Sequence, residues 1–158
     1  MLETCRNAQE RWGGVHQLID RWLIARRELV TAYETLDMEP LMGPVREVSE
    51  LERLCDMLVD YMSTAHFEIY EQLVAEAREF QDERAIEFAD SVYPRLQALT
   101  DAALNFNDRF ERGAYRDPGL LTIELKLLGE TLRERFELED CLIEVLHTSH
   151  QQPRLASV

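Results

Sequence analysis

LVDYMSTAHFEIYEQL, residues 58–73, has the spacing of a helix with one buried side. At about 100° per residue, its apolar side chains form a stripe that also includes a cysteine one turn upstream. The stripe comprises Cys55, Leu58, Met62, Ile69 and Leu73. His66 falls within the stripe, which predicts a polar ring in the core. The opposite side of the helix carries Asp56, Asp60, Phe67 and Glu71. This helix therefore offers an inner polar site and an outer acidic site.

The composition is that of an acidic single-domain protein. The 158 residues include 31 acidic and 17 basic side chains, which gives a net charge of −14. Such a charge argues against binding to nucleic acid or to an anionic membrane and favours a basic partner, although it also suits plain solubility. Three cysteines without a C-x-x-C pair indicate neither a disulfide framework nor a zinc site. Because the sequence has no signal-peptide pattern and no apolar run of about 18 residues, we expect a soluble cytoplasmic protein.

Helical spacing recurs along the rest of the chain. We expect four helices at about residues 4–36, 49–78, 82–112 and 118–150, followed by a flexible tail at 151–158. The second helix has the capping-box spacing from Ser49 to Glu52. The fourth opens with Asp117 as N-cap and Pro118 at the first helical position. Four striped helices with mostly short connections predict an all-α fold, an antiparallel up-down-up-down four-helix bundle spanning residues 1–150.

Glycine and proline mark the expected interruptions. Gly13 and Gly14 predict either a kink or a separate short helix near the start of the first helix, because each glycine weakens a helix interior. Pro94 predicts a kink in the third helix, since it removes one backbone hydrogen bond. Gly113 is placed to end that helix.

Polar residues also occupy inward positions on the other helices. Arg26 lies in the apolar stripe of the first helix, and Arg135 and Glu139 join the two halves of the stripe on the fourth. The last two are one turn apart, so they can pair with each other. In the expected bundle these three residues and His66 lie at similar levels. We therefore predict a structural polar layer of Arg26, His66, Arg135 and Glu139 that fixes the register of the helices.

Catalytic and metal sites are weakly indicated. The chain has a single Glu-x-x-His triplet, Glu144 to His147, at the end of the last helix, whereas a di-iron bundle needs two. His66 is the only histidine on a predicted stripe, and Glu71, five residues on, should face away from it. An enzyme could use His66 as a base oriented by Glu139, with Arg135 binding an anion, but no nucleophile or phosphate-binding motif accompanies them. We predict no catalytic residues, no metal and no other cofactor.

Three sequence blocks add a family resemblance. LIDRWL at 18–23, LVDYMSTAHFEIYE at 58–71 and RFELEDCLIEVL at 135–146 resemble the signature blocks of the Rsd/AlgQ family of bacterial regulators of sigma D. CRNAQERWGGVH at 5–16 is most similar to the AlgQ branch. The resemblance covers essentially the whole chain, and the departures are confined to the loop after the first helix, the region around Gly113 and the tail. It implies a four-helix bundle without enzymatic activity, an anti-sigma factor that binds region 4 of the primary sigma factor.

The implied partner agrees with the charge of the chain. Region 4 is a helix-turn-helix with a basic DNA-binding surface, and an acidic bundle face can occupy that surface and exclude promoter DNA and the polymerase core. We predict that Asp56, Asp60, Phe67 and Glu71 form the contact surface, with no direct nucleic-acid or membrane contact and with other cytosolic proteins as possible partners. The alternative function is a small-molecule or metal-binding bundle that uses the inner polar layer.

Overall fold

The computed structural model describes residues 8–38, 44–111 and 118–150, and all of its regular elements are helical. The predicted all-α fold is confirmed. The first long helix is α2 (Ala8–Met38), and the last is α6 (Pro118–Leu146), which a 3₁₀ turn follows at Thr148–His150. The second rod comprises α3 (Pro44–Thr64), a π-helical turn (Ala65–Tyr70) and α4 (Glu71–Glu79), and the third is α5 (Glu83–Glu111).

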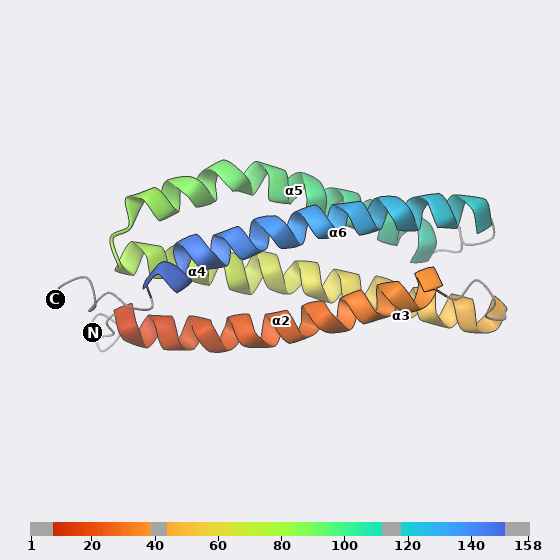
Figure 1. Cartoon of the computed structure of the whole chain (residues 1–158), viewed down its shortest axis with the longest axis horizontal. Coiled ribbons are helices and arrows are strands. Elements are labelled where there is room, and N and C mark those ends of the chain that lie inside the picture. Colours follow the sequence, from red (N-terminus) through yellow and green to blue (C-terminus); the bar gives the residue numbers. More distant parts are fainter. Residues whose placement is uncertain (1–7, 39–43, 112–117, 151–158) are drawn as a thin grey trace.

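The four rods lie along one axis. Figure 1 shows that consecutive rods run in alternate directions, so the start of α2 and the end of α6 lie at the same end of the bundle. Packing is closest between α5 and α6 and between α2 and α3, and it is sparse between α2 and α6. None of the helices in the described ranges is long and apolar enough to cross a membrane.

Several helix boundaries differ from the predicted ones. The second rod begins at Pro44, not at Ser49, because proline suits the first helical turn, where its missing N–H is not needed. α2 is continuous through Gly13 and Gly14, and α5 is continuous through Pro94, with a visibly bowed ribbon (Figure 1). α6 begins at Pro118, as predicted. Gly113, Asp117 and the predicted tail lie outside the described residues.

The turn between α4 and α5 is set by its own backbone and by an acidic cap. Gln81 has a φ of 55°, in the left-handed region that reverses the chain after a helix. The Asp82 side chain accepts a hydrogen bond from the backbone N–H of Ala85 at 3.1 Å, which caps α5. The side chain of His150 packs into the same turn, with Nε2 2.9 Å from the Asp82 carboxylate. Hydrogen bonding to His150 and to the backbone lowers the pKa of Asp82.

The core is continuous along the bundle. Every apolar residue of the predicted stripe, from Cys55 to Leu73, is at most 2% exposed. Trp22 of α2 stacks on Tyr61 of α3, with ring centroids 5.1 Å apart, and meets Tyr70 edge-on. The burial predicted for the apolar residues of this stripe, on the second rod, is therefore confirmed.

Gly129 lies where α2 and α6 approach each other. A Cβ at this position would lie 2.9 Å from Cζ of Tyr33 and closer still to its hydroxyl oxygen. The Tyr33 hydroxyl donates a hydrogen bond to the carbonyl of Leu125 at 2.8 Å, which holds the ring over the glycine. By contrast, a Cβ at Gly14 would meet no atom within 4 Å.

The two glycines should respond in opposite ways to alanine. Gly14→Ala is expected to raise the free energy of unfolding by up to about 1 kcal/mol, because alanine is the better helix former. Gly129→Ala is expected to lower it by about 1–3 kcal/mol, because the new methyl group displaces Tyr33. Urea denaturation of both variants measures the difference. A stabilised Gly129→Ala protein would mean that Tyr33 is not held against α6.

Candidate partner-binding surface and the polar layer behind it

The π-helical turn changes which side chains of the second rod face inward. In a π-helix the backbone bonds join residues five apart, so each residue advances by less than the 100° of an α-helix. Ala65, Ile69 and Tyr70 are the buried residues of the turn. Tyr70 thereby takes the inward polar position that the α-helical spacing assigns to His66.

His66 lies in a surface groove. The groove has a volume of about 470 Å³ and is lined by His66, Tyr70, Glu71, Val74, Arg78 and Tyr93. His66 Nδ1 is 3.4 Å from the Tyr93 hydroxyl oxygen, and the ring is partly exposed. The prediction that His66 belongs to the inner polar layer is therefore wrong. So is the prediction that Glu71 faces away from His66, because a spacing of five residues places two side chains on one face of a π-helical turn.

Phe67 is the most unusual residue on this side of the bundle. Its side chain is 67% exposed, and its ring meets His66 edge-on, with centroids 4.8 Å apart. Tyr93 on α5, whose ring lies beside His66, is 43% exposed. Exposed aromatic side chains next to a groove have the character of binding anchors, since they offer large apolar area at low entropic cost.

The predicted acidic residues lie on the same rod. Asp56 and Asp60 on α3 are exposed, and so is Glu71, at the start of α4. The π-helical turn separates the two aspartates from Glu71, so Glu71 belongs to the groove and not to a single straight line with Asp56 and Asp60. We use the name Phe67 surface for Asp56, Asp60, His66, Phe67, Glu71 and Tyr93.

Arg135 is the centre of the polar layer behind this surface. Arg135 and Glu139 are both 0% exposed, and Arg135 Nε lies 3.4 Å from Glu139 Oε1. The Nη2 group of Arg135 donates to the hydroxyl oxygen of Tyr70 at 2.8 Å. Its Nη1 group donates to the carbonyl of Leu96 at 3.3 Å and to the hydroxyl oxygen of Thr100. One guanidinium group therefore connects α6 to the π-helical turn and to α5.

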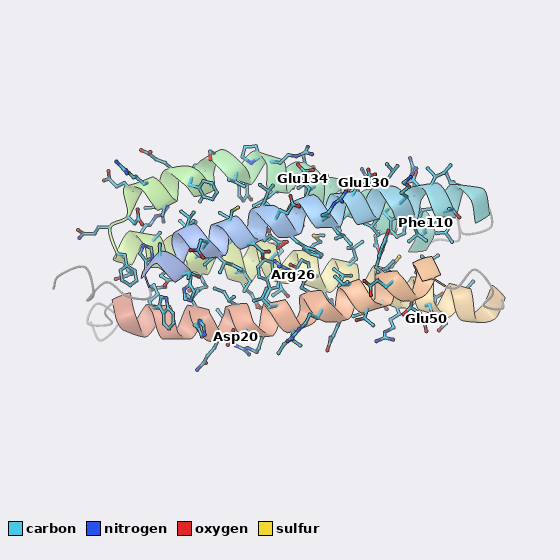
Figure 2. The ribbon with its side chains drawn as sticks, viewed as in Figure 1. Asp20, Arg26, Glu50, Phe110, Glu130 and Glu134 are labelled. Carbon is cyan, nitrogen blue, oxygen red and sulfur yellow. The ribbon has the colours of Figure 1, made fainter. Side chains whose placement is uncertain are left out.

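The layer continues to α2 through Tyr61. The Tyr61 hydroxyl donates to the Glu139 carboxylate, with distances of 3.0 and 3.1 Å to its two oxygens. Arg26 Nε donates to the Tyr61 hydroxyl oxygen at 3.0 Å, and Arg26 Nη1 donates to Asp140 at 2.6 Å. Figure 2 shows Arg26 between α2 and α6, near the middle of the bundle. The structure thus brings Arg26, Arg135 and Glu139 together and leaves His66 outside.

Burial controls the protonation of the layer. Burial raises the pKa of Glu139 from 4.5 to about 7, while the positive charges of Arg135 and Arg26 oppose the rise. Burial also raises the pKa of the Tyr61 and Tyr70 hydroxyls, so both remain protonated hydrogen-bond donors at neutral pH. The layer therefore contains two arginines, Arg26 and Arg135, and one carboxyl group, that of Glu139, which titrates close to neutral pH.

The raised pKa of Glu139 should make stability depend on pH. Between about pH 4.5 and 7 the folded protein retains a proton that the unfolded chain has released, so the contribution of Glu139 to stability falls as the pH rises through this window. Urea denaturation at several pH values between 5 and 8 measures the effect, with Glu139→Gln as the variant that removes it. Equal pH dependence of the two proteins would contradict the assigned titration.

A second buried polar cluster escaped prediction. Glu76 and His147 are 0% and 2% exposed, and His147 Nδ1 lies 2.6 Å from a carboxylate oxygen of Glu76. The other ring nitrogen of His147 is 3.3 Å from Nδ1 of His16. Trp12 stacks on both histidine rings and donates its Nε1–H to the carbonyl of His147 at 3.1 Å. The cluster connects α2 and α4 to the residue that directly follows α6, at one end of the bundle.

The sequence positions of His147 and Glu76, next to apolar stripe residues, are compatible with this cluster but do not specify it. The prediction that His66 is the only histidine on a stripe is wrong, because His147 follows Leu146 into the core. Glu76 lies three residues after Leu73, on the buried side of its helix. Within the described ranges, no group of three or more His, Cys, Asp or Glu residues is placed to hold a metal ion.

Comparisons with known proteins identify the family. The family model described as Regulator of RNA polymerase sigma(70) subunit, Rsd/AlgQ, matches residues 1–147. A Regulator of sigma D from Yersinia enterocolitica is 35% identical over 149 residues, which cover 91% of this chain and 89% of the relative. One from Enterobacter sp. strain 638 is 36% identical over 148 residues, covering 90% and 88%. One from Yersinia pseudotuberculosis is 33% identical over 161 residues, covering 99% and 95%. No solved structure was found to match. The chain therefore belongs to the Rsd/AlgQ family of regulators of the RNA polymerase sigma(70) subunit.

Proposed function

We propose that this protein binds region 4 of the primary sigma factor through the Phe67 surface and thereby keeps sigma from the promoter −35 element and from the polymerase core. The observation that carries the proposal is the 67% exposure of Phe67 beside a groove, on the same rod as exposed aspartates. An apolar anchor rimmed by carboxylates suits a partner whose surface is basic and partly apolar. The protein acts by occupancy, without enzymatic activity, in the cytoplasm where RNA polymerase works.

Within the Phe67 surface, the carboxylates favour the approach of the partner, and the aromatic residues provide the apolar contact. The net charge of −14 and the exposed Asp56 and Asp60 favour approach of a basic helix-turn-helix. Phe67 and Tyr93 supply apolar area that is removed from water on contact, and the ring of each lies beside that of His66. Carboxylates at the rim act mainly on the rate of association and on specificity, whereas a central aromatic residue acts on the lifetime of the complex.

The polar layer is a weaker candidate for ligand binding. Arg135 and Glu139 have no exposed surface, form an ion pair with each other and are hydrogen-bonded to neighbouring tyrosine hydroxyls. A small molecule or metal ion would have to break those bonds to reach them. The layer is better suited to fixing the register of the rods, and thereby the position of the π-helical turn that presents Phe67.

Asp60→Lys should test the proposed contact. The substitution replaces an attraction with a repulsion against a basic partner, and we expect affinity for isolated sigma region 4 to fall at least tenfold, as measured by calorimetric titration. Asp108→Lys is the matched control, because it makes the same change of charge at an exposed position on α5. Circular dichroism should give the same helix content for both variants.

Two outcomes would overturn parts of the proposal. Equal loss of affinity in Asp60→Lys and Asp108→Lys would mean that only overall charge matters and that the contact surface lies elsewhere. Absence of binding between region 4 and the unmodified protein would remove the proposed function itself. Affinity should also fall with rising salt, since exposed charges are screened.

A further inference from the structure

A groove between α2 and α6 is separate from the Phe67 surface. It has a volume of about 440 Å³, within the usual range for small-molecule sites. Its lining residues come from both helices and include Tyr33 and Glu34 on α2 and Gly129, Leu132, Phe136 and Glu137 on α6. These helices face the viewer in Figure 1, where α2 lies below α6. The groove exists because packing between the two helices is sparse.

The wall of this groove depends on a close helix contact. Tyr33 reaches across to the carbonyl of Leu125, and its ring lies against Gly129, where no side chain larger than hydrogen fits without displacing it. A glycine costs a helix interior about 1 kcal/mol relative to alanine. Leu132 and Phe136 continue the apolar lining one and two turns further along α6. Aromatic and aliphatic side chains therefore form a lining suited to an apolar ligand group.

The charges around the lining favour a cation. Glu34, Glu137 and Asp140 provide three carboxylates, and two guanidinium groups face them, those of Arg133 and Arg26. Asp140 is already bonded to Arg26 at 2.6 Å. Within the part of the chain that the structure describes, Glu34 and Glu137 form no ion pair. The Arg26 guanidinium also lies 4.7 Å from the centroid of the Phe136 ring, so this ring already contacts a cation on one side.

We propose that the groove between α2 and α6 binds a small organic cation, an aromatic or branched aliphatic group that carries one ammonium. The apolar part lies between Tyr33, Leu132 and Phe136, and the ammonium pairs with Glu34 and Glu137. The site goes beyond the proposed sigma contact, because it shares no residue with the Phe67 surface.

A pair of probes with one apolar body tests the proposal. 4-Phenylbutylamine is a cation at neutral pH, and 4-phenylbutyrate carries a carboxylate on the same phenyl chain. Each is titrated into the full-length protein while backbone amide shifts are followed by NMR. We expect saturable shifts at Gly129 and at neighbouring residues with the amine, and at least tenfold weaker binding of the butyrate.

Glutamine variants test whether Glu34 and Glu137 pair with the ammonium group. Glu34→Gln combined with Glu137→Gln should weaken binding of the amine at least fivefold. Glu28→Gln combined with Glu144→Gln removes the same number of charges from exposed positions on the same two helices and should leave affinity unchanged. Equal binding of the two probes, or equal effects of the two double variants, would overturn the cation assignment. Absence of saturable shifts at Gly129, or shifts confined to another face, would overturn the site.

Discussion

Arg135→Leu is expected to lower the free energy of unfolding by about 3–5 kcal/mol, which is the usual loss when one partner of a buried ion pair is removed. Arg135 has no exposed surface and donates to Tyr70, Thr100 and the carbonyl of Leu96 in addition to its contact with Glu139. Leucine fills part of the space but removes the donor to the Tyr70 and Thr100 hydroxyls, whereas the Leu96 carbonyl still accepts from Thr100. It also removes the charge that opposes the rise in the pKa of Glu139, so the carboxyl group should take up a proton at neutral pH.

Two further variants separate this effect from a general loss of charge. Arg133→Leu removes an exposed arginine two residues away on α6 and should change stability by less than about 0.5 kcal/mol. Arg135→Leu combined with Glu139→Leu should cost less than Arg135→Leu alone, because it does not leave a carboxyl group buried without its partner. Urea denaturation at pH 7 measures all three. Equal stabilities of Arg135→Leu and Arg133→Leu would mean that Arg135 reaches water.

The long-range plan of the bundle follows from spacing that the sequence displays directly. Each rod has apolar residues every three or four positions, and every apolar residue of the stripe from Cys55 to Leu73 is buried. Arg135 and Glu139 interrupt a stripe on one helix, so their burial was predictable from position alone. Pro118 opens α6 because its ring geometry suits a first turn and little else in a helix. Such features depend on one helix at a time.

The π-helical turn could not be predicted in this way. A π-helical turn has no characteristic spacing over six residues, and the sequence from Ala65 to Tyr70 suits an α-helix equally well. The turn moves His66 from the expected core into a surface groove and brings Tyr70 to Arg135. A small local change in helix winding thus places Tyr70 in the polar layer at the position predicted for His66.

The Glu76–His147 pair was missed for a different reason. A glutamate or histidine at the edge of a stripe is compatible with either solvent or core, and composition cannot decide between them. The decision rests on contacts between three helices that only the folded chain brings together, including the stacking of Trp12 on His16 and His147. The same limit applies to Tyr61, which reads as an apolar core residue and yet bridges Arg26 and Glu139.

Phe67→Ala is expected to weaken binding of sigma region 4 to the proposed Phe67 surface by at least about 30-fold, equivalent to about 2 kcal/mol. The side chain is 67% exposed in the free protein, so its removal should leave the free energy of unfolding almost unchanged. Ile123→Ala is the matched control, because Ile123 is 59% exposed on α6, a helix that contributes no residue to the Phe67 surface. The comparison separates loss of a specific anchor from loss of exposed apolar area.

The kinetics of these variants should distinguish an anchor from a steering charge. An apolar anchor acts after the partners have met, so Phe67→Ala should mainly raise the dissociation rate, whereas Asp60→Lys should mainly lower the association rate and reduce its dependence on salt. Surface plasmon resonance with immobilised region 4 measures both rates. If Phe67→Ala binds as the unmodified protein does while Asp60→Lys binds weakly, the carboxylates of α3 carry the contact and the aromatic groove does not. If Ile123→Ala weakens binding as strongly as Phe67→Ala, region 4 contacts α6, and the Phe67 surface is wrongly assigned.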